Sequence, residues 1–338
     1  AASLPRMRLL VTGGAGFIGS NFVHYWLERH PGDHVVVYDL LTYAGNRASL
    51  ADVDERIVFV QGDIGDLDLA TKTIDDEELD TIVNFAAESH NSLAVLDPGL
   101  FARTNVLGTP LLLEAARATG VRRFHHISTC EVFGDLALDS DEVFTEESPY
   151  RPRTPYNASK AGADHAVRAY SETFGLPVTI TNCSNNYGAY QFPEKVLPLF
   201  VTNALDDLPL PMYASTGNKR EWLHVLDHCR AIDRVLQEGR LGETYNVGSG
   251  VEATIEALAD VVLGLTGKPA SLKTIVPDRP GHDRRYLLDA SKIRDELGWE
   301  PAHGFADGVA ETVAWYEANR AWWEPLKQRA PVEETAWR

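Results

Sequence analysis

A glycine-rich turn near the start of the chain constrains the fold more than any other feature. Residues 7–12 read MRLLVT, a short apolar strand that runs directly into GGAGFIGSNFVHYWLERH, which has the pattern of an amphipathic helix. Gly13, Gly16 and Gly19 lie at this junction. Glycines there let the backbone turn tightly and approach a phosphate group, to which the N-terminus of the helix presents its N–H groups. This segment therefore predicts a dinucleotide-binding strand–turn–helix unit.

Strands and helices alternate along the first half of the chain. Further apolar strands are expected at 34–39, 56–63, 81–88, 122–129 and 177–184. Helical spacing of apolar residues predicts helices at 105–120 and 157–175. Such alternation is typical of a parallel sheet that is covered on both faces. The predicted fold class is therefore α/β, a Rossmann-type doubly wound parallel sheet.

The carboxylate that ends the second strand indicates which dinucleotide is bound. Asp39 follows Gly19 by 20 residues, where an acidic side chain binds the ribose hydroxyls of NAD and repels the 2′-phosphate of NADP. Asp63 follows the third strand, at a position suited to the adenine. We therefore predict NAD as the cofactor. Its expected contacts are Gly13, Gly16, Phe17, Ile18, Gly19, Asp39, Asp63 and Ile64, together with Tyr156 and Lys160.

Composition and charge exclude several other classes of protein. The 338 residues carry a net charge of −18 without a run of Lys and Arg. Because such a surface repels a phosphate backbone, no nucleic-acid partner is expected. No apolar run approaches the roughly 20 residues that span a bilayer, so no membrane partner is expected. The cysteines lack disulfide or zinc-site spacing, and we expect a reduced, cytoplasmic protein without a metal site.

Tyr156 and Lys160 form the most informative pair for chemistry. Their spacing of four residues places both side chains on one face of the expected helix. An ammonium group near a phenol lowers the pKa of the phenol, so the tyrosine could take a proton from an alcohol or sugar hydroxyl as hydride leaves. Ser128 and Thr129 close the preceding strand, where a hydroxyl could hold the same substrate oxygen. The pair predicts an NAD-dependent oxidation.

The chain resembles the extended short-chain dehydrogenase/reductase family in its nucleotide-sugar branch. The resemblance is carried by TGGAGFIGSN, NFAAESH, YNASK and NCSNNYG. The segments LTYAGN, FPEKVLPLF, NKREWLHVLDH and RPGHDRRYLLDASKIRDELGWEP resemble the dTDP-glucose 4,6-dehydratases in particular. The similarity extends over roughly residues 7–325. It implies a nucleotide-sugar lyase that oxidises the sugar at C4 and then breaks a bond at C5 or C6.

The resemblance also implies roles for individual residues and a homodimer built on helices 105–119 and 157–174. Tyr156 would deprotonate the C4 hydroxyl, and Lys160 would tune it and bind the nicotinamide ribose. Thr129 would hold the C4 oxygen, and Glu131 would act at C5. The dTDP- or UDP-linked sugar would be bound by Ser89, Asn185, Lys195, Arg220, Arg279 and Arg284.

One motif departs from the dehydratase pattern. The dehydratases carry Thr-Asp-Glu, whose aspartic acid protonates the departing C6 hydroxyl, and this chain has Thr129, Cys130 and Glu131. A thiol is a weaker acid than a carboxyl group, and a general acid contributes roughly 10²–10⁴-fold to a rate. Ser92 and Leu93 also replace the usual residues beside the sugar. The sequence therefore leaves the reaction at C6 open.

Several reactions could follow oxidation at C4. The leading prediction is decarboxylation of a nucleotide-linked glucuronate to a (4-keto)pentose, because it needs no acid at C6 and related decarboxylases carry Thr-Ser-Glu or similar. The alternative is a dTDP-glucose 4,6-dehydratase, or a 5,6-eliminating variant, in which Cys130 replaces the acid. A C4 epimerase would leave Glu131 without a role, and an inactive sugar-nucleotide-binding protein would not need Tyr156 and Lys160. These two are minor alternatives.

A change in composition and in the pattern of strands and helices along the sequence predicts two domains. After about residue 185 the regular alternation weakens, and Pro, Gly and aromatic residues increase. We expect residues 1–185 to form the NAD-binding Rossmann domain, with about 222–250 returning to it. Residues 186–221 and 251–338 are expected to form a smaller α/β domain that binds the nucleotide sugar.

Overall fold

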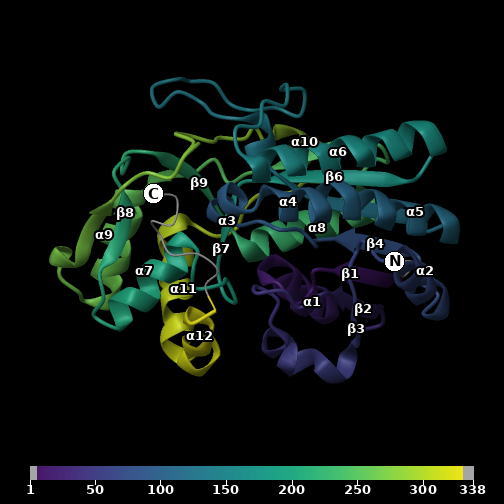
Figure 1. Cartoon of the computed structure of the whole chain (residues 1–338), viewed down its shortest axis with the longest axis horizontal. Coiled ribbons are helices and arrows are strands. Elements are labelled where there is room, and N and C mark those ends of the chain that lie inside the picture. The colour runs from purple at the N-terminus through teal and green to yellow at the C-terminus, as the bar shows by residue number, and fades with distance from the viewer. Residues whose placement is uncertain (1–5, 330–338) are drawn as a thin grey trace.

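A seven-stranded parallel sheet forms the centre of the larger region of the molecule (Figure 1). The computed structural model describes residues 6–329; residues 1–5 and 330–338 of the expected domains lie outside this range. The strand order is β10-β6-β5-β4-β1-β2-β3. The strands are β1 (Arg8–Thr12), β2 (His34–Asp39), β3 (Val58–Gln61), β4 (Thr81–Asn84), β5 (Arg123–Thr129), β6 (Val178–Cys183) and β10 (Thr244–Val247).

The order of the strands reverses between β1 and β4, which pair with each other. From β1 the chain proceeds through β2 and β3 to one edge and then returns to build β4, β5 and β6 on the other side. In an open α/β sheet a crevice forms at this switch point, outside the carboxyl ends of the strands. The predicted fold class is confirmed, and the topology places a binding crevice beside the glycine turn.

Helices cover both faces of this sheet because the strands are apolar on both sides. Leu9 and Val11 of β1 point to one face of the sheet. They pack there against α1 (Phe17–Arg29) and α8 (Val225–Glu238). Leu10 faces the opposite way. It packs with α2 (Leu67–Asp76), α5 (Thr109–Thr119) and α6 (Pro155–Phe174). The alternation of side chains along a strand thus produces two separate cores.

Two expected elements have different bounds in the structure. The strand expected at 81–88 ends at Asn84. The residues that follow pass close to the glycine turn, where a Cβ on Gly13 would lie 2.6 Å from the Ala86 nitrogen. The helix expected from residue 105 begins as α5 at Thr109. A segment with wider, π-type turns (Ala102–Gly108) precedes it.

The smaller region contains two short sheets and a helical layer. Its first sheet has the order β11-β9-β7 (Glu252–Thr254, Lys219–His224 and Asn185–Tyr187), and the second pairs β12 (Lys273–Val276) with β8 (Leu210–Tyr213). Its core includes Phe200, Leu258, Tyr316 and Trp323. The helices of this core are α7 (Val196–Leu205), α9 (Ile255–Thr266), α11 (Phe305–Ala318) and α12 (Arg320–Lys327).

Short helices occupy the connections between these layers. They are α3 (Asn91–Leu96), α4 (Pro98–Phe101), α10 (Ser291–Leu297) and the 3-10 segments Arg47–Arg56, Cys130–Phe133 and Ala270–Leu272. Among the described residues, none of the helices combines the length and the apolar character that crossing a membrane requires.

Two glycine-to-alanine substitutions should change stability in opposite directions. A Cβ on Gly19 would lie 2.3 Å from the Gly13 carbonyl oxygen, so Gly19→Ala should force the turn apart at a cost of about 1–3 kcal/mol. Gly264 lies inside α9 with open space around its Cα. Gly264→Ala should therefore stabilise the protein by about 0.5–1 kcal/mol. Urea unfolding of both variants measures the difference. Equal stability of the two variants would contradict the close approach at the turn.

Candidate active site

A single large cavity of about 1060 Å³ brings the predicted cofactor and catalytic residues together. It lies at the carboxyl ends of the sheet strands and extends into the smaller region. Of the predicted site residues, those that line it are Gly13, Gly16, Phe17, Ile18, Gly19, Asp39, Asp63, Ile64, Ser89, Thr129, Glu131, Tyr156, Lys160, Asn185, Lys195, Arg220 and Arg279. Cys130 and Arg284 do not line it.

The glycine turn has the shape of a cradle for a pyrophosphate. Gly13 adopts φ +65°, and a Cβ there would lie 2.6 Å from the backbone nitrogen of Ala86. Asp39 is 8% exposed, and its carboxylate accepts the backbone N–H groups of Ala15 (2.9 Å) and Leu41 (2.8 Å). These bonds fix the carboxylate at the rim and leave lone pairs for the hydroxyls of a ribose. The residues present therefore fit a dinucleotide.

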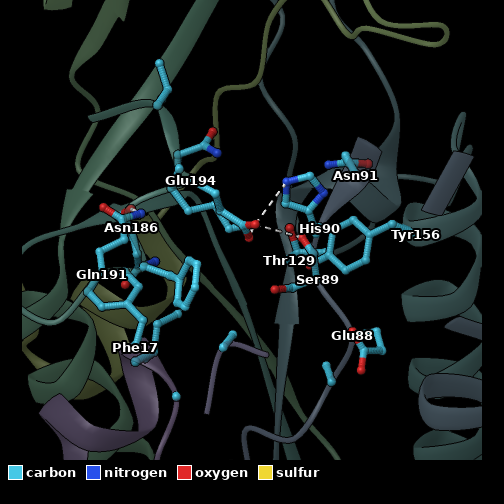
Figure 2. Close-up of a pocket in the computed structure, with 18 of the residues that line it drawn as sticks. Phe17, Glu88, Ser89, His90, Asn91, Thr129, Tyr156, Asn186, Gln191 and Glu194 are labelled. Atoms are coloured by element: carbon cyan, nitrogen blue, oxygen red, sulfur yellow. Dashed lines mark hydrogen bonds and ion pairs between the residues drawn. The ribbon is translucent and has the colours of Figure 1, made fainter. Parts of the chain in front are cut away.

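Tyr156, Thr129 and Glu131 meet at the other end of the cavity. Figure 2 shows the ring of Tyr156 beside Thr129, with His90 and Asn91 next to them. Thr129 ends β5, and Tyr156 lies in the first turn of α6. The Glu131 carboxylate accepts a hydrogen bond from the Asn91 side-chain amide at 3.0 Å. A hydroxyl, a phenol and a carboxylate thus share one wall of the cavity.

Lys160 lies in a buried polar cluster beneath this wall. It is 4% exposed, and its Nζ donates to the Ile127 carbonyl at 2.7 Å and lies 3.3 Å from His126 Nε2. His126 Nε2 lies 3.4 Å from a carboxylate oxygen of Asp164, which is completely buried. Burial lowers the pKa of Lys160, although the charge of Asp164 opposes the effect. The cluster therefore holds the lysine in a defined position.

The pKa of Tyr156 differs from the expectation. Its pKa lies well above the ordinary value of a tyrosine, chiefly because the phenol is buried and secondly because Glu131 is nearby. The hydrogen bond with Thr129 acts in the opposite direction. The ammonium of Lys160 donates to the Ile127 carbonyl, so a lowering of the Tyr156 pKa by Lys160 stays a prediction.

Cys130 occupies a different environment from its two neighbours in the motif. It is 1% exposed and packs in an apolar cluster with Val132, Phe133 and Leu288. Burial first, and the charge of Glu131 second, raise the pKa of its thiol well above the usual value. The thiol therefore lies outside the lining of the cavity, unlike Thr129 and Glu131 on either side of it, and its predicted catalytic role stays a prediction.

Three cationic side chains line the part of the cavity that extends into the smaller region: Lys195, Arg220 and Arg279. The Nε atom of Arg279 is buried and has no hydrogen-bond partner among the described residues. An unpaired buried donor is suited to an anion. Arg284, also expected to bind the substrate, lies outside the cavity because its guanidinium binds Asp135 at 2.7 Å.

The sequence did not indicate the pair of Glu194 and His90, which also lines the cavity. Glu194 accepts a hydrogen bond from the Tyr43 hydroxyl at 2.7 Å, and its other oxygen lies 3.4 Å from His90 Nε2 (Figure 2). Burial lowers the pKa of His90 to about 3, so its ring is neutral. Lys195 was the only residue of the segment FPEKVLPLF that the sequence indicated as part of the site. Glu194 was not indicated, because nothing in the sequence relates residue 194 to residues 43 and 90.

Comparisons with known proteins agree with this geometry. A family model described as GDP-mannose 4,6 dehydratase matches residues 10–312. The chain is similar to the dTDP-glucose 4,6-dehydratase of Streptomyces antibioticus, with 49% identity over 96% of both chains. A dTDP-glucose 4,6-dehydratase of Mycobacterium tuberculosis is 50% identical over 95% of this chain and 96% of that protein. These relatives favour the dehydratase alternative and do not support the decarboxylase that led the predictions.

Solved structures similar to this chain also include those of enzymes that act on nucleotide sugars. A dTDP-glucose 4,6-dehydratase from Streptomyces venezuelae, solved with NAD bound, superimposes with a TM-score of 0.91 at 52% identity, covering 95% of this chain and all of that one. A UDP-glucose 4-epimerase from Thermotoga maritima has a TM-score of 0.87 at 27% identity, over 93% of this chain and all of the epimerase. The chain therefore belongs to the nucleotide-sugar branch of the extended short-chain dehydrogenase/reductase family, with the sugar-nucleotide 4,6-dehydratases.

Proposed function

We propose that this protein is an NAD-dependent dTDP-glucose 4,6-dehydratase. The observation that carries the proposal is the meeting of Tyr156, Thr129 and Glu131 in the cavity that also contains the glycine turn and Asp39. Identity of about half over nearly the full length of dehydratases supports dTDP-glucose as the substrate. The decarboxylase prediction assumed that replacing an acid by Cys130 removes a charge beside C6. That assumption loses its physical basis because residue 130 faces the apolar core.

The glycine turn and Asp39 would hold the cofactor. Gly13 and Gly19 leave room for the pyrophosphate, and Asp39 would accept the ribose hydroxyls. When bound, NAD would supply the hydride chemistry, as acceptor of the C4 hydrogen with its electron pair and as its donor at C6. We assign residues 1–185, with about 222–250, to this task and the remainder to the nucleotide sugar. Lys195, Arg220 and Arg279 are proposed to neutralise its diphosphate.

Tyr156 and Thr129 are proposed to carry the oxidation at C4. The Thr129 hydroxyl would hold the C4 oxygen, and Tyr156 would accept the proton of the C4 hydroxyl. Because burial raises the pKa of Tyr156, a nearby positive charge must favour its ionised form. Lys160, one turn further along α6, is the proposed source of that charge.

Glu131 is proposed to perform the elimination. A ketone at C4 acidifies the proton at C5, which the Glu131 carboxylate would remove. The C6–O bond breaks as the C5–C6 double bond forms, and the oxygen leaves as water, which requires a proton. When hydride later adds at C6, a proton from solvent adds at C5. Because the Cys130 thiol lies in the core, Glu131 is the ionisable group of the motif that can return a proton to this oxygen. One carboxyl group would thus act first as base and then as acid.

Apolar side chains near helices α5 and α6 support the proposed homodimer. Leu107, just before α5, is 58% exposed, and Phe174, at the end of α6, is 54% exposed. Exposed apolar side chains of this size are suited to a protein interface.

Product analysis tests the proposed function directly. With NAD and dTDP-glucose, the protein should yield a product lighter by the mass of one water, and Tyr156→Phe should reduce the rate by roughly 10²–10⁴-fold. UDP-glucuronate and dTDP-glucuronate serve as competing substrates in separate incubations, analysed by mass spectrometry. Release of carbon dioxide from a glucuronate, with no loss of water from dTDP-glucose, would overturn the proposal.

Two substitutions in the motif separate the roles of neighbouring residues. Cys130→Ala should keep the dehydration kcat within about three-fold, because its thiol donates no proton to the substrate. Glu131→Gln should lower kcat by roughly 10²–10⁴-fold. Steady-state kinetics on folded protein, checked by circular dichroism, measure both. A loss in Cys130→Ala comparable to that in Glu131→Gln, at unchanged stability, would show that the thiol takes part in the reaction.

A further inference from the structure

Two histidines and a glutamate come together away from the catalytic cavity. His224 ends β9, His303 lies in the loop before α11, and Glu311 lies on α11. Each offers one ligand atom, and these atoms all lie within 4.8 Å of one another. None of the three residues lines the large cavity. The cluster therefore needs an explanation separate from the proposed dehydratase chemistry.

His224 contributes a polar atom that the surrounding protein leaves unpaired. The residue is 5% exposed, and its Nδ1 is buried without a hydrogen-bond partner among the described residues. An unpaired buried polar atom destabilises the folded state. A phenylalanine would fill the same space without this cost, so packing alone does not account for an imidazole here.

The two imidazole rings lie face to face. They stack with centroids 4.0 Å apart and an angle of 25° between their planes. Each ring offers one nitrogen within 4.8 Å of the other ring's nitrogen and of a Glu311 oxygen. Three possible ligand atoms from three separate segments therefore lie close together.

Asp227 fixes the position of His303. Its Oδ2 accepts the backbone N–H groups of Ala302 (3.0 Å) and His303 (2.9 Å), and it lies 3.1 Å from Nδ1 of the His303 ring. In metal sites, a carboxylate beside one nitrogen of a histidine orients the ring and leaves the other nitrogen to the metal. The Asp227 carboxylate lies beside one nitrogen of the His303 ring in this way, at ion-pair distance and without a hydrogen bond to it.

We propose that His224, His303 and Glu311 bind a divalent zinc-type cation. Two imidazoles and a carboxylate form a ligand set that zinc accepts, with a water molecule as the fourth ligand. Tetrahedral zinc places its ligand atoms roughly 3.3 Å apart, so atoms that lie within 4.8 Å of one another would draw together by at most about 1.5 Å. Glu311 is exposed and can make this adjustment.

Such a site would connect the two regions of the molecule. His224 immediately precedes α8, which packs on the large sheet, and Glu311 belongs to α11, which packs in the core of the smaller region. A cation bound between them would join α11 to the start of α8. Because a bound ion stabilises the folded state, thermal stability should increase with zinc concentration.

The test uses the full-length protein without an affinity tag, after removal of metal by a chelator. Zn²⁺ is titrated in competition with a chromophoric indicator, and Co²⁺ serves as a second probe through its visible absorption. We expect one Zn²⁺ per chain and a rise in melting temperature. His303→Asn and Glu311→Gln should each weaken binding by at least about ten-fold.

His165→Asn is the matched control, because His165 is an exposed histidine on α6, outside the cluster. This variant should bind Zn²⁺ as the wild type does. The proposal is overturned if the wild type binds no Zn²⁺ or if His303→Asn and Glu311→Gln bind it unchanged. Equal weakening by the control would also overturn it. Glu311→Gln alters an exposed side chain, so its result does not depend on how well a core variant folds.

Discussion

The rest of the active site depends on the hydrogen bonds by which two buried charged residues of α6, Lys160 and Asp164, attach this helix to β5. Both side chains lie in the interior, where an ionised group is costly unless neighbours compensate for the lost water. Lys160 donates to the Ile127 carbonyl of β5 at 2.7 Å, and Asp164 accepts the Ser128 hydroxyl of the same strand at 2.7 Å. These bonds hold α6 in one position along β5. Tyr156, on the same helix, is therefore held beside Thr129 at the end of that strand.

This arrangement explains why adjacent side chains of the motif Thr129–Glu131 have different surroundings. Thr129 is the last residue of β5, and the chain then turns through the 3-10 segment Cys130–Phe133. Alternate side chains point in different directions through this turn, so Glu131 reaches the cavity and Cys130 enters an apolar cluster. The chemistry therefore depends on which side chains the turn exposes as much as on which residues the motif contains.

Much of the fold follows from the sequence because its determinants are local. The glycine turn, the apolar strands and the end of β2 at Asp39 each depend on residues close together in the chain. The end of β4 was not predictable, since it lies where Phe85 and Ala86 pass close to Gly13, which is far away in the sequence. The direction of Cys130 was not predictable either, because it depends on packing against Leu288, far along the chain.

The cluster of His224 and His303 illustrates the same limit. Three α-helices (α8, α9 and α10) and three strands separate these residues in the chain. The stacking of their rings arises only when α11 packs near the start of α8. The expectation of no metal site was based on the spacing of the cysteines. That spacing says nothing about whether two distant histidines come together in the fold. Sequence patterns thus identified many of the residues that line the large cavity, whereas contacts between distant segments determined the shape of its wall and the second cluster.

The most direct test of the account follows the hydrogen at C4 of the sugar. The protein is incubated with an equal mixture of C4-deuterated and unlabelled dTDP-glucose, and the products are analysed by mass spectrometry and NMR. If one cavity performs oxidation, elimination and reduction, labelled product carries deuterium at C6 and has lost one water, and no label passes between molecules. Reduced cofactor that accumulates with the deuterium, or a product that retains its C6 oxygen, would contradict this account.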